Sequence, residues 1–257
     1  MNILIVGNWK MHLAPAEAVK LVKKLQERIP PNRDVGVVLC PPFIDLVPVQ
    51  EVLERGHFKL GAQNCHVMDE GASTGETSAT MLRGIAEYVI IGHSERRHEF
   101  YEDDKLIAKK MAAAVRNGLK PILCVGETLD ERHDGLSTKV VTAQVTAGLM
   151  MLTAEEVETV VIAYEPVWAI GSGASATPDQ IKPMIAVLKA TVHELYLGDE
   201  PVVPILYGAG VEPEFVSAIL SVPHVSGLLV GGASLHYEKF AQIVICAQDM
   251  QRAAKLA

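Results

Sequence analysis

The stretch Val160–Gln180, with the sequence VVIAYEPVWAIGSGASATPDQ, contains a strand, a carboxylate and a loop in immediate succession. Its first residues, Val160–Tyr164, are β-branched or apolar and are typical of a strand buried on both faces. Glu165 follows where the strand should end, and the loop after it contains Gly171 and Gly173. A carboxylate at a rigid strand end, followed by a glycine-containing lid, suits a general base that works with water excluded. For this stretch alone, an ordinary βα loop with a solvated glutamate is the alternative.

The end of this stretch is predicted to begin a helix. Thr177 suits the N-cap position, Pro178 the first helical position and Gln180 the third position, as in a capping box. Pro183 would then lie inside the helix, where a proline costs about 3 kcal/mol or kinks the helix axis. The sequence therefore leaves two helix starts open, one at Pro178 and one at Pro183.

Apolar or β-rich runs recur along the whole chain, and segments with helical periodicity lie between most of them. The runs are Ile3–Gly7, Val35–Cys40, Leu60–Gln63, Tyr88–Ile91, Pro121–Val125, Val160–Tyr164, Pro204–Tyr207 and Gly227–Val230. Eight strands that alternate with helices in about 250 residues predict a parallel sheet closed into a single (β/α)₈ barrel domain, residues 1–257. The competing fold, a doubly wound open sheet, would favour a G-x-G-x-x-G turn after the first strand, where this chain has Gly7–Lys10.

Two apolar stripes mark helix faces that we expect to pack on the sheet. The first stripe consists of Ala18, Leu21, Val22, Leu25 and Ile29. The second stripe consists of Leu106, Met111, Ala114 and Val115. Gly118 is the expected C-cap of the second helix.

The composition limits the classes of protein to which the chain can belong. Apolar residues make up 49% of it, which suffices for a barrel core and an outer ring of helices. The formal net charge of −8 disfavours nucleic acid and anionic membranes as partners. No apolar run approaches the length that crosses a bilayer. A local site can still oppose the global charge, so an anionic small substrate stays possible.

Four cysteines are spread along the chain: Cys40, Cys65, Cys124 and Cys246. They show neither C-x-x-C nor Cys/His ligand spacing, so we expect no disulfide and no metal site. The N-terminus has no signal-peptide pattern, because Asn8 and Lys10 interrupt it early. These features predict a cytoplasmic protein in a reducing compartment.

Chemistry in (β/α)₈ enzymes gathers at the carboxyl ends of the strands, so the residues at these ends are candidates for a site. In chain order they are Asn8 and Lys10, Gln63 and Asn64, His93, Gly126 and Glu127, Glu165, Gly208–Gly210, and Gly231 and Gly232. Lys10, His93 and Glu165 are thus directed toward a common mouth. Taken singly, Lys10 could be a solvated loop charge and His93 a satisfied histidine at a helix start, and the glycines could serve tight turns only.

The motifs at these strand ends together resemble triosephosphate isomerase along the whole chain. They are GNWK (Gly7–Lys10), GAQN (Gly61–Asn64), IIGHSERR (Ile90–Arg97), LCVGETL (Leu123–Leu129), AYEPVWAIG (Ala163–Gly171), YGAGV (Tyr207–Val211) and LVGGASL (Leu229–Leu235). Each motif is a weak pattern alone, but all of them in the family's order are highly specific.

The resemblance implies an isomerase of glycolysis and gluconeogenesis that interconverts dihydroxyacetone phosphate and glyceraldehyde 3-phosphate through an enediol. It implies that Glu165 is the base that removes a proton from the carbon beside the carbonyl. His93 is then the neutral electrophile, and the helix start at Ser94 disfavours a cationic ring. Lys10 stabilises the negative charge of the enediolate, and Glu95 holds Lys10 in place. No metal or organic cofactor is implied.

The resemblance also implies how the triose phosphate is bound. Backbone N–H groups would cradle the phosphate at Gly171, Gly210, Gly231 and Gly232. Asn8 would hydrogen-bond near the substrate oxygens. The phosphate is remote from the reacting carbons, so its binding energy can drive closure of the lid over Glu165.

The loop His66–Glu76 is long for a barrel βα loop, which usually marks a function. In the family, a loop at this place reaches into the partner subunit beside that subunit's lysine and histidine. Thr74 and Gly75 are therefore expected to help form a homodimer. A local flap on a monomer is the alternative.

The chain departs from the family at the lid. Gly210 stands where most members have a serine, and Ala174 and Ser175 stand where a lysine and a threonine are common. The first change removes a hydroxyl that would bond the closed lid. The alternative is that Gly210 simply eases a tight turn while its N–H still binds the phosphate. The lid would then be latched from elsewhere, through the Tyr207 hydroxyl.

Two rival functions remain open on the sequence alone. Another phosphate-binding barrel enzyme would share the glycine turns, but it would not be expected to pair GNWK with GHSERR and a lid after the glutamate. A non-catalytic barrel scaffold would be favoured if Lys10, His93 or Glu165 were replaced, and all three are present.

Overall fold

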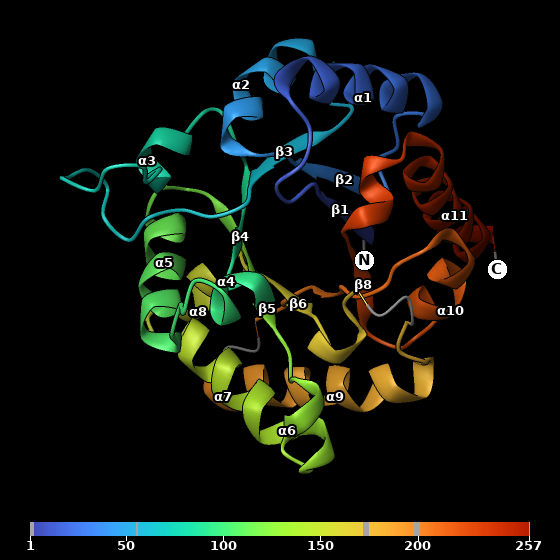
Figure 1. Cartoon of the computed structure of the whole chain (residues 1–257). Coiled ribbons are helices and arrows are strands. Elements are labelled where there is room, and N and C mark those ends of the chain that lie inside the picture. The colour runs from blue at the N-terminus through green and yellow to red at the C-terminus, as the bar shows by residue number, and fades with distance from the viewer. Residues whose placement is uncertain (1–2, 55, 172–174, 198–200, 257) are drawn as a thin grey trace.

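The computed structural model describes residues 3–54, 56–171, 175–197 and 201–256. In it, eight parallel strands close into a barrel, and their order around the barrel is their order in the chain (Figure 1). The strands are β1 (Ile3–Asn8), β2 (Val35–Cys40), β3 (Lys59–Ala62), β4 (Tyr88–Ile91), β5 (Lys120–Val125), β6 (Val161–Tyr164), β7 (Ile205–Tyr207) and β8 (Val225–Val230). Strand β8 pairs with β1, so the sheet has no free edge. The predicted (β/α)₈ barrel is confirmed, and the open doubly wound sheet is wrong.

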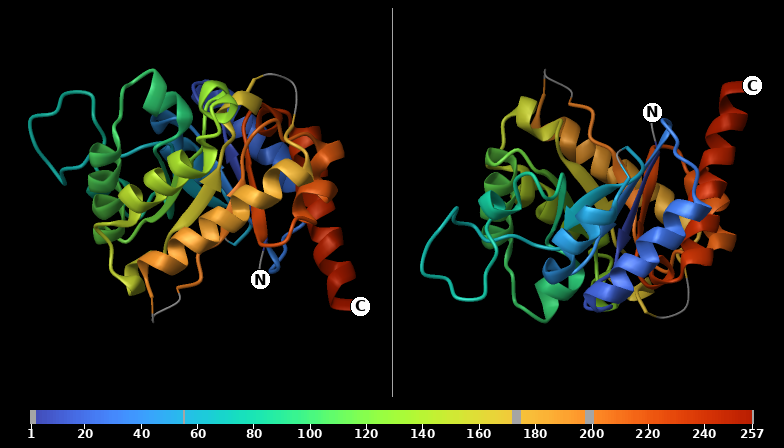
Figure 2. Two further views of the ribbon diagram at one scale, coloured as in Figure 1. Left: turned by 90° about the horizontal axis from the view of Figure 1, so that it is seen from below. Right: turned by 90° about the horizontal axis from the view of Figure 1, so that it is seen from above.

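Helices surround the strands on all sides (Figure 1 and Figure 2). They are α1 (Pro15–Arg28), α2 (Phe43–Val52), α3 (Ala79–Leu82), α4 (Ser94–His98), α5 (Asp104–Arg116), α6 (Leu129–His133), α7 (Ser137–Leu149), α8 (Ala154–Val157), α9 (Pro178–Leu195), α10 (Val216–Leu220) and α11 (Tyr237–Leu256). Short 3₁₀ turns lie at Val167–Ala169, Pro213–Phe215 and Gly232–Leu235. Within the described ranges, none of the helices combines the length and the apolar character that a bilayer span requires.

The alternation of side chains along the strands divides the core into two layers. One layer fills the inside of the barrel and consists of Val6, Val38, Cys40, Tyr88, Ile90, Ile122, Cys124, Val161, Ala163, Leu206 and Leu229. Neighbouring strand residues such as Ile5 and Ile91 belong to the outer layer, which packs under the helices. Each strand is therefore buried on both faces, which is why the apolar runs in the sequence are nearly continuous.

The first predicted helical stripe is confirmed, and the second is partly wrong. On α1 the buried residues are Ala18, Leu21, Val22 and Leu25. On α5 the buried apolar face consists of Ile107, Ala108, Met111, Ala113 and Ala114, whereas Leu106 and Val115 are only half-buried. Ile107, Met111 and Ala114 have the spacing of one helix face, and Leu106 lies one position off it. The C-cap is Asn117, and Gly118 follows it with a positive φ of 75°.

Helix α9 begins at Pro178 and continues through Pro183 to Leu195. Its start is held by the predicted capping box, in which the Thr177 N–H donates to Gln180 Oε1 at 2.9 Å. Pro183 cannot donate a main-chain hydrogen bond inside this helix. Its side chain is exposed, and the helix continues past it. Of the two helix starts that the sequence leaves open, the one at Pro178 is confirmed.

Candidate active site

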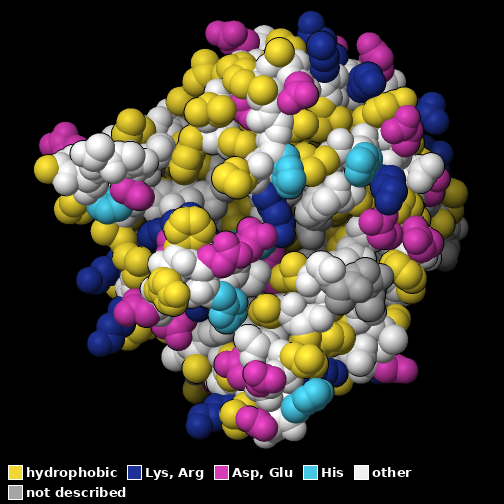
Figure 3. Space-filling view, viewed as in Figure 1, with side chains coloured by type: hydrophobic (Ala, Val, Ile, Leu, Met, Phe, Trp, Pro, Cys, Tyr) yellow, Lys and Arg dark blue, Asp and Glu magenta, His cyan; other side chains and the backbone are white. Residues whose placement is uncertain are grey.

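A hollow of about 230 Å³ opens at the carboxyl ends of the strands, on the face of the molecule that Figure 3 shows. Its lining includes the predicted site residues Asn8, Lys10, His93, Glu165, Gly171, Gly210, Gly231 and Gly232. They come from the ends of β1, β4, β6, β7 and β8, far apart in the chain. The hollow is smaller than the usual range of about 300–1,000 Å³ for drug-sized ligands, so it suits a small metabolite.

Glu165, the residue after β6, lies beside His93 in this hollow. Its Oε1 atom is 3.2 Å from His93 Nε2, and its Oε2 atom accepts the Ser94 N–H at 3.4 Å. Both side chains are almost completely buried. A carboxylate held here can take up a proton from a ligand carbon once it leaves these contacts, and water has little access to it.

His93 is the N-cap of α4, and the first turn of this helix orients its ring. The Glu95 N–H donates to Nδ1 at 3.3 Å, and only an unprotonated ring nitrogen can accept it. The ring proton then lies on Nε2, the nitrogen that faces Glu165. Glu95 Oε2 is also 3.4 Å from Nδ1 and would pair with a charged ring. The Glu95 N–H, which the helix holds in place, thus orients the ring with Nε2 toward Glu165.

Lys10 follows β1 with a positive φ of 53°, an unusual conformation for a lysine. Its Nζ atom is 2.5 Å from Glu95 Oε1, so the expected ion pair is present. Burial is the largest single effect on the pKa of the Glu95 carboxyl and raises it, but the hydrogen bond from Lys10 and the positive charges nearby together outweigh burial and hold that pKa below its ordinary value. The charged pair therefore fixes the ammonium group at the edge of the hollow.

Gln63 holds the main chain of Lys10 in this conformation. Its Nε2 atom donates to Lys10 O at 2.8 Å and to Cys40 O at 2.9 Å. The Lys10 N–H donates to Asn8 Oδ1 at 3.0 Å. The sequence marks Gln63 only as a residue at a strand end, because these partners become neighbours only when β1, β2 and β3 pair.

The glycine positions that line the hollow differ in whether they could hold a side chain. Gly210 has a positive φ of 53°, which disfavours any side chain there. A Cβ atom on Gly231 would meet Lys10 Cε at 3.6 Å, an ordinary contact, and a Cβ atom on Gly232 would meet nothing within 4 Å. Gly231 and Gly232 thus leave open space beside Lys10, where an anion could approach the main chain.

The lid expected after Glu165 is described at its two ends. Gly171 lines the hollow, while the interpretations that concern Gly173 and Ala174 lie outside the described residues. At the far end, the Ala176 N–H donates to the Tyr207 hydroxyl at 3.0 Å. Burial raises the pKa of this phenol, so the hydroxyl that receives this hydrogen bond stays neutral.

Glu127, after β5, anchors the near end of the same segment. This fully buried carboxylate accepts hydrogen bonds from Trp168 Nε1 at 3.0 Å, from the Tyr164 hydroxyl at 3.1 Å and from Arg132 Nη1 at 3.0 Å. Sequence reasoning missed this role. The signal that could have indicated it is a glutamate at one strand end and a tryptophan in the lid that follows the next strand.

The other predicted residues lie outside the hollow. Ser94 and Glu95 hydrogen-bond to Glu165 and Lys10, which line it, whereas Tyr207 accepts the Ala176 N–H at the far end of the lid. Thr74 and Gly75 lie on a loop that extends away from the barrel body (Figure 1 and Figure 2). Within a single chain, the structure does not bring these two residues to the site.

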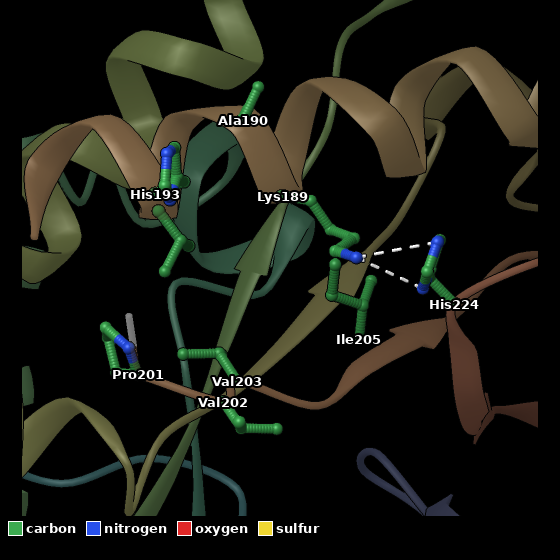
Figure 4. Close-up of a pocket in the computed structure, with 9 residues that line it drawn as sticks. Lys189, Ala190, His193, Pro201, Val202, Val203, Ile205 and His224 are labelled. Atoms are coloured by element: carbon green, nitrogen blue, oxygen red, sulfur yellow. Dashed lines mark hydrogen bonds between the residues drawn. The ribbon is translucent and has the colours of Figure 1, made fainter. Parts of the chain in front are cut away.

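A larger hollow of about 580 Å³ lies at the opposite end of the barrel, between α9 and the starts of β7 and β8 (Figure 4). Lys189 Nζ is 3.1 Å from His224 Nδ1 at its edge, and Val202, Val203 and Ile205 contribute apolar surface. None of the predicted site residues lines it, and its described lining includes no carboxylate. Size alone therefore does not identify the candidate active site.

Comparison with known proteins adds independent information. The sequence profile of the triosephosphate isomerase family matches residues 3–247. The triosephosphate isomerase of Carboxydothermus hydrogenoformans is 48% identical over 244 residues, which cover 93% of this chain and 96% of that protein. The triosephosphate isomerase of Clostridium tetani is 47% identical over 244 residues, with 94% and 95% covered. That of Caldanaerobacter subterraneus subsp. tengcongensis is 46% identical over 245 residues, with 94% and 98% covered.

Proposed function

Because the chain belongs to the triosephosphate isomerase family, we propose that the hollow at the carboxyl ends of its strands is the active site of that isomerisation. The protein interconverts dihydroxyacetone phosphate and D-glyceraldehyde 3-phosphate, a step of glycolysis. The observation that carries the site assignment is the 3.2 Å approach of Glu165 Oε1 to His93 Nε2, in one hollow with Lys10. Neither rival function has support in the comparisons.

In this proposal Glu165 takes a proton from C1 of dihydroxyacetone phosphate, and the C1–H electron pair forms the C1–C2 double bond. The C2 carbonyl oxygen receives a proton from His93 Nε2, which leaves an enediol. Glu165 then returns its proton to C2 while the O1 proton passes back to the histidine, and C1 becomes the aldehyde. Lys10 stabilises the negative oxygen between these steps. The backbone N–H groups of the glycines hold the phosphate.

A coupled assay with glyceraldehyde 3-phosphate tests the function directly. We expect the purified protein to turn this substrate over without an added metal or organic cofactor. Phosphoglycolate, a mimic of the enediolate, should inhibit it. A folded protein that neither isomerises the substrate nor binds phosphoglycolate would contradict the proposal.

The lid supplies a prediction at Gly210. We expect Gly210→Ser to bind phosphoglycolate more tightly and to raise kcat/KM, by up to about tenfold, because one added hydrogen bond to the closed lid is worth roughly 0.5–1.5 kcal/mol. The variant should also unfold more easily by about 1–2 kcal/mol, since its side chain must adopt a positive φ. Inhibition and steady-state kinetics measure the first effect, and thermal unfolding the second.

The matched control for this variant is Gly84→Ser. Gly84 also has a positive φ, of 77°, and an added Cβ atom there would meet nothing within 4 Å. The control variant should lose stability similarly and leave kcat/KM unchanged. If Gly210→Ser folds normally and binds phosphoglycolate as the parent does, the missing hydroxyl is not a missing latch. The Tyr207 hydroxyl, which already accepts the Ala176 N–H, would then hold the lid by itself.

We further propose a homodimer in which the loop between β3 and α3 completes the partner's active site. The loop is closed at its neck, where the His66 N–H donates to Thr77 O at 2.8 Å, and Asp69 is fixed to Arg116 at 2.9 Å. Its tip is largely exposed.

Hydrophobic side chains gather over α2 and α3 beside this loop (Figure 3). The exposed ones are Phe43, Ile44 and Val47 on α2 and Met81 on α3, and Met11, after β1, is also exposed. An apolar patch of this kind supports a protein interface.

Deletion of Gly71–Glu76 should yield monomers with little activity, because each active site would lose the loop of the other chain. Sedimentation velocity and the coupled assay measure the two effects on one sample. A folded parent protein that sediments as an active monomer would overturn the dimer proposal.

A pair of point variants separates the interface from the fold. Ile44 and Leu197 are 69% and 72% exposed, so a glutamate at either position should be tolerated in one chain. Ile44→Glu places a charge in the proposed interface and should shift the protein to monomers. Leu197→Glu lies outside the proposed interface, after the last turn of α9, and should leave the assembly unchanged.

We also propose that the enzyme works in the cytoplasm, without a metal, an organic cofactor, a nucleic acid or a membrane as partner. All four cysteines, which lie within the described ranges, are free. Burial raises the pKa of Cys40, Cys65 and Cys124, so these thiols stay protonated and unreactive. Free thiols support a reducing compartment, and the net charge of −8 opposes binding to polyanions.

A further inference from the structure

Gln144, on α7, binds the main-chain residue that lies directly behind the proposed base. Its Oε1 atom accepts the Gly126 N–H at 2.8 Å, and its Nε2 atom donates to Gly126 O at 3.2 Å. Gly126 is the residue after β5 and is buried. One side-chain amide therefore satisfies both polar groups of a buried glycine, which an apolar side chain of the same length cannot do.

Gly126 contacts the main chain of Glu165 with no space between them. An added Cβ atom on Gly126 would lie 1.8 Å from Glu165 O and 2.6 Å from the Glu165 carbonyl carbon. The preceding residue, Val125, accepts the Glu165 N–H at 2.8 Å. The end of β5 thus supports the peptide groups on both sides of Glu165. A shift of Gly126 must move the Cα atom from which the carboxylate extends.

Helix α7 is itself held closely against β5. Gly148 lies one turn after Gln144 on the same helix face, and an added Cβ atom there would lie 2.5 Å from Leu123 Cδ2. On the other side of the base, an added Cβ atom on Gly208 would lie 3.3 Å from Glu165 Cγ. The base is thus packed between β5 and β7, and Gln144 is the polar link from the helix layer to this packing.

We propose that Gln144 is a positioning residue for the isomerisation: it holds Gly126 against Glu165 and thereby sets where the Glu165 carboxylate lies. The inference rests on the proposed role of Glu165 as the base. Proton abstraction depends steeply on the distance and direction between the base and the carbon. The phosphate cradle and Lys10 belong to other strand ends, with which Gln144 shares no described hydrogen bond, so substrate binding should be little affected.

The first test is Gln144→Met, which keeps the length of the side chain and removes both hydrogen bonds. We expect kcat to fall by about 10- to 100-fold, since a displacement of the base by a fraction of an ångström to about 1 Å costs that much. KM should stay within about twofold, because ground-state binding is retained. The Kd of phosphoglycolate should also stay within about twofold, because in this proposal Lys10 and the glycine N–H groups hold it, and Gln144 does not position them. The matched control is Gln26→Met. Gln26 also makes two main-chain hydrogen bonds, to Val52 O and from the Glu54 N–H, at the opposite end of the barrel.

The second test is Gln144→Glu, whose kcat is measured as a function of pH. An ionised carboxylate can accept the Gly126 N–H but cannot donate to Gly126 O. A protonated carboxyl can do both, as the amide does. The ratio of variant kcat to parent kcat should therefore rise toward one as the pH falls through the pKa of the introduced carboxyl. The protonation of Glu165 occurs in both enzymes, so its effect largely cancels in the ratio. The ratio for Gln26→Glu should stay flat.

The inference is wrong if Gln144→Met keeps kcat within about twofold of the parent, or if it loses kcat and phosphoglycolate affinity together. Should Gln144→Met not fold, the pH series of Gln144→Glu decides alone, and a flat ratio rejects the inference. These outcomes are distinct from failure of the proposed function. In that case the parent would be inactive, or Glu165→Asp would turn over as the parent does.

Discussion

Lys10→Met should lower both kcat and phosphoglycolate affinity by on the order of 1,000-fold. Lys10 is the sole lysine or arginine among the described residues that line the hollow, whereas Glu165 and Glu212 also line it. A unit charge about 4 Å from an anion is worth about 4 kcal/mol at an effective dielectric constant of about 20, which corresponds to a factor of about 1,000. Without the Lys10 ammonium group, the charged side chains that line the hollow would be carboxylates, which repel a phosphate dianion.

Steady-state kinetics and calorimetric titration with phosphoglycolate measure these losses. The matched control is Lys59→Met, which changes the net charge by the same amount. It removes the ion pair between Lys59 Nζ and Glu87 Oε1, which are 2.8 Å apart at the other end of the barrel. It should leave both quantities unchanged. If the Lys10→Met enzyme binds phosphoglycolate as tightly as the parent, Lys10 does not supply the positive charge of the site.

The Glu165→Asp enzyme should keep its fold and lose about 100-fold or more in kcat. The shorter side chain withdraws the carboxylate by about one C–C bond, and a misplacement of about 1 Å can cost about 100-fold in rate. The same retraction removes the contacts of Glu165 with His93 Nε2 and the Ser94 N–H. Because the site lies in a rigid barrel, the surrounding strands cannot follow the shorter side chain.

The coupled assay gives kcat, and thermal unfolding shows whether the fold is retained. Glu158→Asp is a suitable control, since Glu158 is exposed near the start of β6, the strand that carries Glu165 at its other end. It should behave as the parent does. Turnover of Glu165→Asp within about threefold of the parent would mean that another group is the base.

The barrel and most of its mouth could be predicted because their signals are local. A strand buried on both faces appears as an unbroken apolar run, and the residue that follows it lies at the mouth whatever the details of packing. Lys10, His93 and Glu165 could be found in this way, and the structure brings them to one hollow. Their chemical roles stay predictions, as do those of Thr74 and Gly75.

The supporting residues could not be predicted because their partners are distant in the chain. Gln144 has the sequence signature of a solvated helix residue, and its function in the fold depends on a glycine 18 positions away. Gln63 and Glu127 stand at strand ends, but their hydrogen bonds to Lys10 and Trp168 exist only after the strands have paired. Lys110 is charged and yet buried on α5, paired with Glu102 and Asn64. Periodicity alone cannot distinguish such a residue from an exposed one.

The closure of the barrel between β1 and β8 has a consequence for the synthesis of the chain. Strand β1 leaves the ribosome before the other seven strands, but its partner along one edge, Val225–Val230, leaves after all of them. Until β8 emerges, β1 and β7 each carry an edge without its partner, and such edges readily pair with other chains. A nascent chain that stalls before residue 225 therefore holds all three of the proposed catalytic residues, Lys10, His93 and Glu165, but no closed sheet. It is a natural client for chaperones that shield exposed strands.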